Sequence, residues 1–97
     1  MKVYISGPIS GLPFEQVERD FNEAEIRLLE QGHEVINPLN NGLPLDSPWL
    51  AHMIVDIRLL LDCNAIYMLK GWKESKGATI EYNLAKELGF AIRTQIK

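Results

Sequence analysis

The stretch AIYMLKGWKESKGATIE, residues 65–81, decides the fold of this chain. Its first five residues form an uninterrupted apolar run, which is typical of a central strand that is covered on both faces. A polar, glycine-containing turn follows at residues 71–77, and Glu81 comes one turn into the helix predicted next. Ligands of open α/β sheets bind beyond the carboxyl ends of the strands, so Glu81 is the first candidate active residue.

The rest of the chain alternates strands and helices in the same way. Strands are expected at residues 2–6, 34–36, 65–69 and 90–93, and helices at residues 14–31, 48–61 and 77–88. Apolar residues at spacings of three and four indicate the helices, and glycines at positions 32 and 89 are typical helix ends. Ser47 and Pro48 are expected to be the N-cap and the first residue of the second helix.

The last helix is expected to pack through Ile80, Leu84 and Leu88, which stack on one face. Strands that alternate with helices imply right-handed crossovers and a mainly parallel sheet between helices. The predicted fold class is therefore α/β: a three-layer αβα sandwich with a Rossmann- or flavodoxin-like sheet of four to five strands. The 97 residues are expected to form one domain, 1–97, without internal repeats.

The composition of the chain argues against several classes of function. The net charge is −3, with 13 acidic against 10 basic residues, which argues against a nucleic acid polymer as partner. The apolar runs are too short to span a membrane, and nothing near Met1 resembles a secretory signal, so a cytoplasmic protein is expected. Cys63 is the only cysteine and is expected to be a packed core thiol.

Three turns follow the predicted strands, at residues 7–11, 37–47 and 71–77, and they should meet at one edge of the sheet as a pocket. The first turn has the sequence Ser6, Gly7, Pro8, Ile9, Ser10, Gly11. Its backbone amides could hold an anion, or it could be only a tight connection from strand to helix. It lacks the phosphate-loop and dinucleotide-binding patterns, which argues against nucleoside triphosphate hydrolysis.

The two candidate acids each have two interpretations. Glu81 is either a solvent-facing residue stabilised by the helix dipole, or a site residue beside the small Gly77 and Ala85, which leave room for a ligand. A carboxylate near a helix N-terminus is expected to stay ionised, which suits a nucleophile. Asp56 is either a site residue or part of a solvated face that includes Arg58.

The histidines and tryptophans of the sequence do not indicate a functional site. His33 and His52 have no partners at metal-ligand spacing, so no metal site is expected. Trp49 and Trp72 lie beside loops, where a large aromatic side chain more often packs the loop down than stacks on a base.

Three parts of the sequence together resemble the nucleoside 2-deoxyribosyltransferase superfamily. They are VYISG at residues 3–7, Asp56 eight residues before Asn64, and residues 75–81 leading into Asn83, Leu84 and Ala85. The resemblance spans nearly the whole chain and is strongest to a short bacterial and phage branch of unknown function. Related members include deoxynucleotide N-hydrolases.

The resemblance implies a reaction at the N-glycosidic bond without a metal or organic cofactor. Glu81 would attack the anomeric carbon and carry the sugar covalently until water or another base accepts it. Asp56 would hold the sugar or assist proton transfer to the leaving base, and Tyr4 would orient the nucleophile. Ser75, Gly77 and residues 6–11 would bind substrate, with Ser75 near a 5′-phosphate.

The resemblance also implies a small-molecule nucleoside or nucleotide partner and a homodimer or higher homo-oligomer. The chain departs from the pattern at two positions. Ser10 stands where the nucleotide hydrolases have an arginine that contacts phosphate, and Asn64 replaces the usual aspartate. The alternative function is a catalytically inactive module that binds a nucleotide or sugar phosphate.

Overall fold

Strands and helices alternate along the chain in the computed structural model, which describes residues 1–95. The elements are β1 (Lys2–Ser6), α1 (Phe14–Glu30), β2 (Glu34–Ile36), α2 (Trp49–Leu61), β3 (Ala65–Met68), α3 (Lys76–Glu87) and β4 (Ala91–Thr94). Two short 3-10 helices, η1 (Pro38–Asn40) and η2 (Trp72–Glu74), lie in the turns after β2 and β3. The order of the strands and helices is the one that the sequence predicts.

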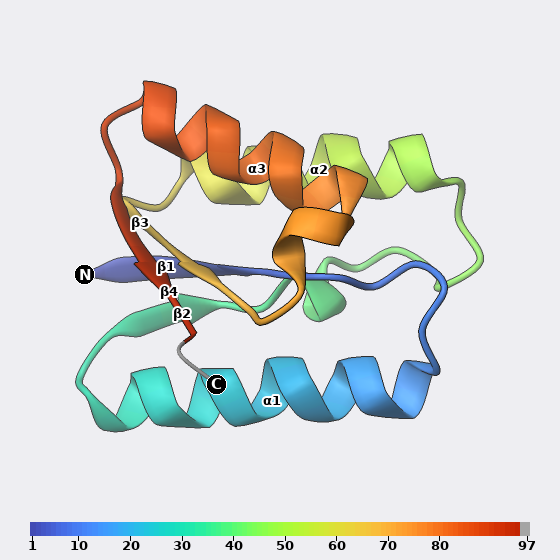
Figure 1. Ribbon diagram of the computed structural model, residues 1–97, viewed down its shortest axis with the longest axis horizontal. Helices are drawn as coiled ribbons and strands as arrows, with labels where there is room; N and C mark the ends of the chain where they lie inside the picture. Colours follow the sequence, from blue (N-terminus) through green and yellow to red (C-terminus); the bar gives the residue numbers. More distant parts are fainter. Residues whose placement is uncertain (96–97) are drawn as a thin grey trace.

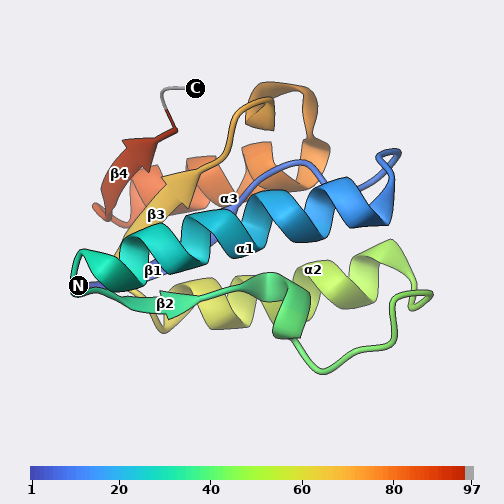
Figure 2. The ribbon, with the colours of Figure 1, turned by 90° about the horizontal axis from the view of Figure 1, so that it is seen from below.

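The four strands form one parallel sheet in the order β2-β1-β3-β4. The two central strands are β1 and β3, paired with Val3 beside Ala65 and Ser6 beside Met68. Helix α1 covers one face of the sheet, while α2 and α3 lie together on the other (Figures 1 and 2). The prediction of a three-layer α/β fold with a parallel Rossmann-like sheet is confirmed.

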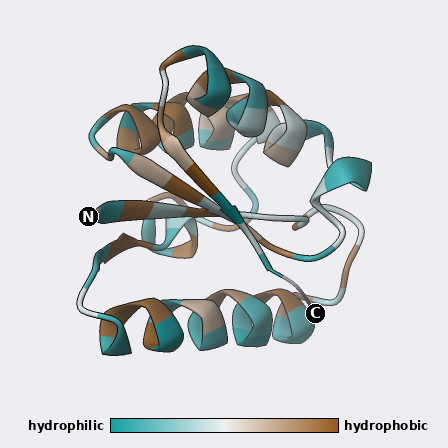
Figure 3. Ribbon diagram, turned by 60° about the vertical axis from the view of Figure 1, so that its left-hand side comes forward, coloured by the Kyte–Doolittle hydropathy of each residue, from teal (hydrophilic) through white to brown (hydrophobic). Residues whose placement is uncertain are grey.

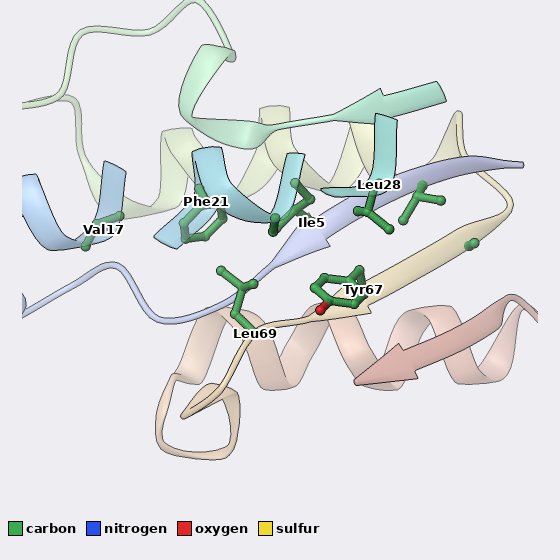
Figure 4. Close-up of a cluster of buried hydrophobic side chains, with 9 residues drawn as sticks. Ile5, Val17, Phe21, Leu28, Tyr67 and Leu69 are labelled. Carbon is green, nitrogen blue, oxygen red and sulfur yellow. The ribbon is translucent and has the colours of Figure 1, made fainter. Parts of the chain in front are cut away.

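Alternation along the strands divides the buried side chains between two core clusters. The cluster under α1 contains Val3, Ile5, Val17, Phe21, Ala24, Leu28, Ala65, Tyr67 and Leu69 (Figure 4). The opposite cluster, under α2 and α3, contains Tyr4, Leu60, Cys63, Ile66, Met68, Ala78 and Ala85. The banded hydropathy of α1 in Figure 3 fits a helix with only one side against the sheet. The same alternation directs Tyr4 and Ser6 toward α3.

The ends of two helices differ from the prediction. Helix α2 begins at Trp49, with Pro48 as its N-cap residue, so Ser47 is not the cap. Helix α3 begins at Lys76 because Ser75 caps it: the Ser75 hydroxyl accepts a hydrogen bond from the Ala78 amide at 3.2 Å.

The buried face of α3 also differs from the predicted one. Ala78, Glu81 and Ala85 are buried, whereas Ile80 and Leu88 are 37% and 48% exposed. Two alanines on the inner face leave the helix backbone close to the sheet, since their side chains fill little space. This close approach carries Glu81 into the interior. Of the predicted apolar face, Leu84 is partly buried against the cluster under α2 and α3, whereas the prediction is wrong for Ile80 and Leu88.

The turns carry more local structure than their composition indicates. The turn predicted at residues 37–47 includes η1, in which the Asn37 side chain accepts a hydrogen bond from the Leu39 amide at 3.0 Å. In the turn after β3, Trp72 stacks on Tyr82 with ring centroids 4.4 Å apart, and so packs η2 against α3. None of the helices within residues 1–95 is long and apolar enough to cross a membrane.

Cys63 is buried in the cluster under α2 and α3, as predicted for a core thiol. Its Sγ lies 3.5 Å from the Leu59 carbonyl oxygen, which accepts its hydrogen bond. Burial raises the pKa of this thiol to about 11.

Candidate active site

A cleft of about 1200 Å³ opens at the carboxyl edge of the sheet. The three turns that follow β1, β2 and β3 all contribute to its walls, together with the first turns of α2 and α3. Of the residues expected at the site, those in the cleft wall are Tyr4, Ser6, Gly7, Pro8, Ile9, Ser10, Asp56, Ser75, Gly77 and Glu81. Gly11 is not part of the wall.

Glu81 lies in the wall of this cleft with 5% of its surface exposed. Both carboxylate oxygens accept hydrogen bonds from β1: the Ser6 hydroxyl donates to Oε1 at 2.6 Å, and the Tyr4 hydroxyl donates to Oε2 at 2.9 Å. The interpretation of Glu81 as a solvent-facing residue is therefore wrong. Two hydroxyl donors fix the carboxylate at the end of the central strand.

The protonation of Glu81 also differs from the expectation. Burial raises its pKa to about 7, against the lowering effect of the Ser6 and Tyr4 hydrogen bonds, and the negative charge of Asp56 raises it further. The helix dipole was expected to keep the carboxylate ionised, but removal from water outweighs it. At neutral pH the side chain is divided between its ionised and protonated forms.

Tyr4 is fully buried in the core beneath Glu81. Burial raises the pKa of its hydroxyl well above the usual value, and the charges of Glu81 and Asp56 act in the same direction. The hydroxyl therefore stays neutral and remains a hydrogen-bond donor to Glu81.

Asp56 is also buried, with 6% of its surface exposed, so the solvated-face interpretation is wrong. It lies on α2, where its Oδ1 accepts a hydrogen bond from Asn41 Nδ2 at 2.9 Å. Burial raises the pKa of the carboxyl group, while the Asn41 hydrogen bond and the nearby His52 lower it. The cleft therefore contains two buried acids on different helices.

Two residues of this site were missed by the sequence analysis. Asn41, in the loop after η1, donates a hydrogen bond from its amide nitrogen to Asp56, and the same nitrogen lies 3.1 Å from His52 Nδ1. His52 Nε2 lies 3.1 Å from the Pro44 carbonyl oxygen. The spacing of four between His52 and Asp56, which places both on one helix face, was the available signal for His52.

Packing alone accounts for two of the glycines expected at the site. A Cβ atom on Gly7 would lie 2.7 Å from Leu69 Cβ, too close for any side chain. A Cβ atom on Gly77 would lie 3.1 Å from Met53 Sδ, so this glycine permits close contact between α3 and α2. Both residues shape the cleft by bringing its walls together.

The rim of the cleft carries charges of both signs. Lys70, Glu74 and Lys76 lie in its wall, and Lys76 Nζ is 4.9 Å from the centre of the Trp49 ring. Within residues 1–95, no three His, Cys, Asp or Glu side chains group closely enough to hold a metal ion.

The chain is similar to known proteins in its fold and in its sequence. A solved structure of a 2-deoxyribosyltransferase from Bacillus psychrosaccharolyticus has a similar fold, with a TM-score of 0.73 and 21% sequence identity. The similarity covers 97% of this chain and 71% of that one, and it establishes a likeness of fold. A comparison with curated proteins finds no match. Residues 1–94 match the domain of unknown function DUF4406, and the chain therefore belongs to that family.

Proposed function

We propose that this protein cleaves the N-glycosidic bond of a nucleoside or nucleotide, as an N-glycosidase or 2-deoxyribosyltransferase, with Glu81 as nucleophile. The observation that supports this proposal is the buried Glu81 carboxylate, whose two oxygens are held by Tyr4 and Ser6 in the wall of a cleft. The fold shared with a 2-deoxyribosyltransferase is consistent with this chemistry.

A purely structural role does not explain why this carboxylate is buried. Burying a carboxylate without a cationic partner costs several kcal/mol or forces its pKa upward. The salt bridge found among the described residues joins Lys2 to Asp62 on the surface, and it does not involve Glu81. A buried acid with a raised pKa in a cleft is instead typical of an active site.

The proposed reaction has two steps. In the first, the ionised Glu81 attacks the anomeric carbon, the bond from carbon to base nitrogen breaks, and its electron pair leaves with the base. Asp56 in its protonated form gives a proton to the departing base. In the second step Asp56 takes a proton from water or an acceptor base, which attacks the anomeric carbon and releases the Glu81 carboxylate with overall retention.

The reactive form therefore needs one proton on the pair, located on Asp56 rather than on Glu81. The two carboxyl groups interact, because the charge of Asp56 raises the pKa of Glu81. Their protons are released in coupled steps that belong to the pair. The pair loses its last proton near the pKa of about 7 given for Glu81, so activity should fall as the pH rises above this value.

A panel of deoxynucleosides and their 5′-monophosphates, analysed by chromatography for free base, tests this function. Base release by the wild type should fall at least about a hundredfold in Glu81→Gln. Glu87→Gln is the matched control, since Glu87 is exposed at the end of the same helix and should leave release unchanged. Binding of panel members without release of base by the wild type would favour the inactive binding module instead.

We also propose that the chain forms a homo-oligomer. Leu50, Ile54 and Leu61 are each more than half exposed on α2, at spacings that place them along one side of the helix. Light scattering should give a multiple of the 11.0 kDa chain mass, and a monomer mass would contradict this.

A further inference from the structure

Three polar side chains connect the loop after η1 to helix α2. Asn41 Nδ2 lies 2.9 Å from Asp56 Oδ1 and 3.1 Å from His52 Nδ1, and His52 Nε2 lies 3.1 Å from the Pro44 carbonyl oxygen. All three side chains form part of the cleft wall. Because each contact has a defined donor or acceptor, the network fixes the location of its protons.

The orientation of the Asn41 amide is determined first. Its Oδ1 accepts a hydrogen bond from the Leu43 amide at 3.0 Å, so the nitrogen must be the atom that faces Asp56 and His52. The amide nitrogen carries two hydrogens, one for each of these partners. Asn41 therefore uses both of its donors within the protein and is not free to recognise a substrate through them.

The tautomer of His52 follows from its two neighbours. The Pro44 carbonyl oxygen can only accept, so Nε2 must carry a hydrogen. The Asn41 amide nitrogen can only donate, so Nδ1 must be unprotonated. The network is complete only with a neutral His52 that holds its proton on Nε2.

The two oxygens of Asp56 are then unequal. Oδ1 accepts from Asn41, whereas Oδ2 has no hydrogen-bond partner among the described residues. Within residues 1–95, every side-chain oxygen or nitrogen that is shielded from solvent has a hydrogen-bond partner. Since Oδ2 has none, it must be accessible to solvent. Because Asp56 lines the cleft, Oδ2 is the oxygen available to a ligand there.

We propose that Asn41 and His52 are positioning residues that place the acid proton of Asp56 on Oδ2. An oxygen that accepts a hydrogen bond from an amide is stabilised as the carbonyl oxygen of a carboxylic acid, so the hydroxyl forms at the other oxygen. His52 holds the second Asn41 hydrogen and thereby prevents the amide from turning away. This inference rests on the proposed function, in which Asp56 protonates the leaving base.

The titratable groups coupled electrostatically to Asp56 come from three elements. His52 on α2 lowers the pKa of Asp56, whereas the charge of Asp56 raises the pKa of Glu81 on α3 and of Tyr4 on β1. Of the side chains that influence Asp56, Asn41 contributes a hydrogen bond that favours the ionised carboxylate. Its removal should therefore raise the pKa of Asp56.

Side-chain NMR of the intact protein tests the network without requiring catalysis. The Asp56 carboxyl carbon should titrate at higher pH in Asn41→Leu than in the wild type, because the hydrogen bond that lowers its pKa is lost. Asn40→Leu is the matched control, because Asn40 is exposed on η1 and should leave the titration unchanged. Nitrogen shifts of His52 should show a proton on Nε2 and none on Nδ1. An unchanged Asp56 titration in Asn41→Leu, or a protonated Nδ1 in neutral His52, would overturn the proposal.

Kinetics with a substrate that releases base give the second readout. Asn41→Leu should lower kcat about tenfold or more while KM changes little, because proton delivery is affected rather than binding. His52→Asn should retain more activity than His52→Leu, since its side-chain oxygen can accept from Asn41 near the position of Nδ1. Equal losses in both His52 variants would contradict a positioning role. Since the NMR results do not depend on turnover, an absence of base release would count only against the proposed function.

Discussion

The Tyr4 hydroxyl donates a 2.9 Å hydrogen bond to Glu81 Oε2, which joins two residues 77 positions apart in the sequence. The bond spans the interface between the central strand β1 and helix α3. Ser6, two residues further along the same strand, holds the other carboxylate oxygen at 2.6 Å. The period of two along a strand brings both donors to the same acid.

The first prediction concerns stability and requires no substrate. Folding raises the pKa of Glu81 from 4.5 to about 7, so the folded state binds this proton more tightly than the unfolded state. The resulting stabilisation is complete below pH 4.5 and is lost as the pH rises through about 7. Glu81→Gln has no such loss, so its free energy of unfolding relative to the wild type should increase by about 3 kcal/mol between pH 4.5 and 8.

Denaturant unfolding at several pH values measures this difference. Glu87→Gln should show the same pH dependence as the wild type, because Glu87 is exposed. A constant difference between Glu81→Gln and the wild type across the range would show that Glu81 titrates normally in the folded protein.

The second prediction concerns the two donors to Glu81. Ser6→Ala and Tyr4→Phe each remove a hydrogen bond that lowers the pKa of Glu81, so each should move the midpoint of the pH profile of kcat/KM to higher pH. The Ser6 bond has the larger effect of the two. Tyr67→Phe is the control, since Tyr67 packs under α1 on the opposite face of the sheet. A shift in the control alone, or a shift to lower pH, would contradict the assignment.

The third prediction concerns the turn after β1. Gly7→Ala should destabilise the fold by about 1–3 kcal/mol, since the new Cβ atom would lie 2.7 Å from Leu69 Cβ. Gly42→Ala is the comparison: its site has open space but a φ of +87°, so the expected cost is about 1 kcal/mol. Both follow from urea unfolding. A larger cost at Gly42 would mean that close packing is not the reason for glycine at position 7.

The fourth prediction concerns Cys63. With a thiol pKa of about 11 and a buried side chain, Cys63 should react with iodoacetamide at pH 8 only as fast as the protein opens. Mass spectrometry of the alkylated protein measures the rate with and without denaturant. Rapid alkylation of the folded protein would show that the cysteine is accessible and not part of the core.

Much of the fold could be predicted because its signals are local. The apolar run at residues 65–69 identified a central strand, and the alternation of strands and helices implied the parallel sheet. The position of Glu81, just after that strand and its turn, singled it out because ligands of such sheets bind there.

The burial of Glu81 could not be predicted in the same way. Ile80, Leu84 and Leu88 form a more apolar face than Ala78 and Ala85, so the pattern favoured a face of α3 on which Leu84 is partly buried but Ile80 and Leu88 are exposed. The small residues face inward because the helix packs closely on the sheet, which is a property of the assembled layers. The hydrogen bond between Asp56 and Asn41 could not be predicted either, because Asn41 lies in a loop, and a loop has no periodic sequence pattern from which its path can be inferred.

The most direct test of the central claim is to find the sugar on Glu81. The protein is incubated with a deoxynucleoside from which it releases base, quenched in acid, digested and analysed by peptide mass spectrometry. We predict a peptide heavier by one deoxyribosyl group, with the modification on Glu81 and no such peptide from Glu81→Gln. Base release that continues in Glu81→Gln, with no sugar on any peptide that contains residue 81, would contradict the account.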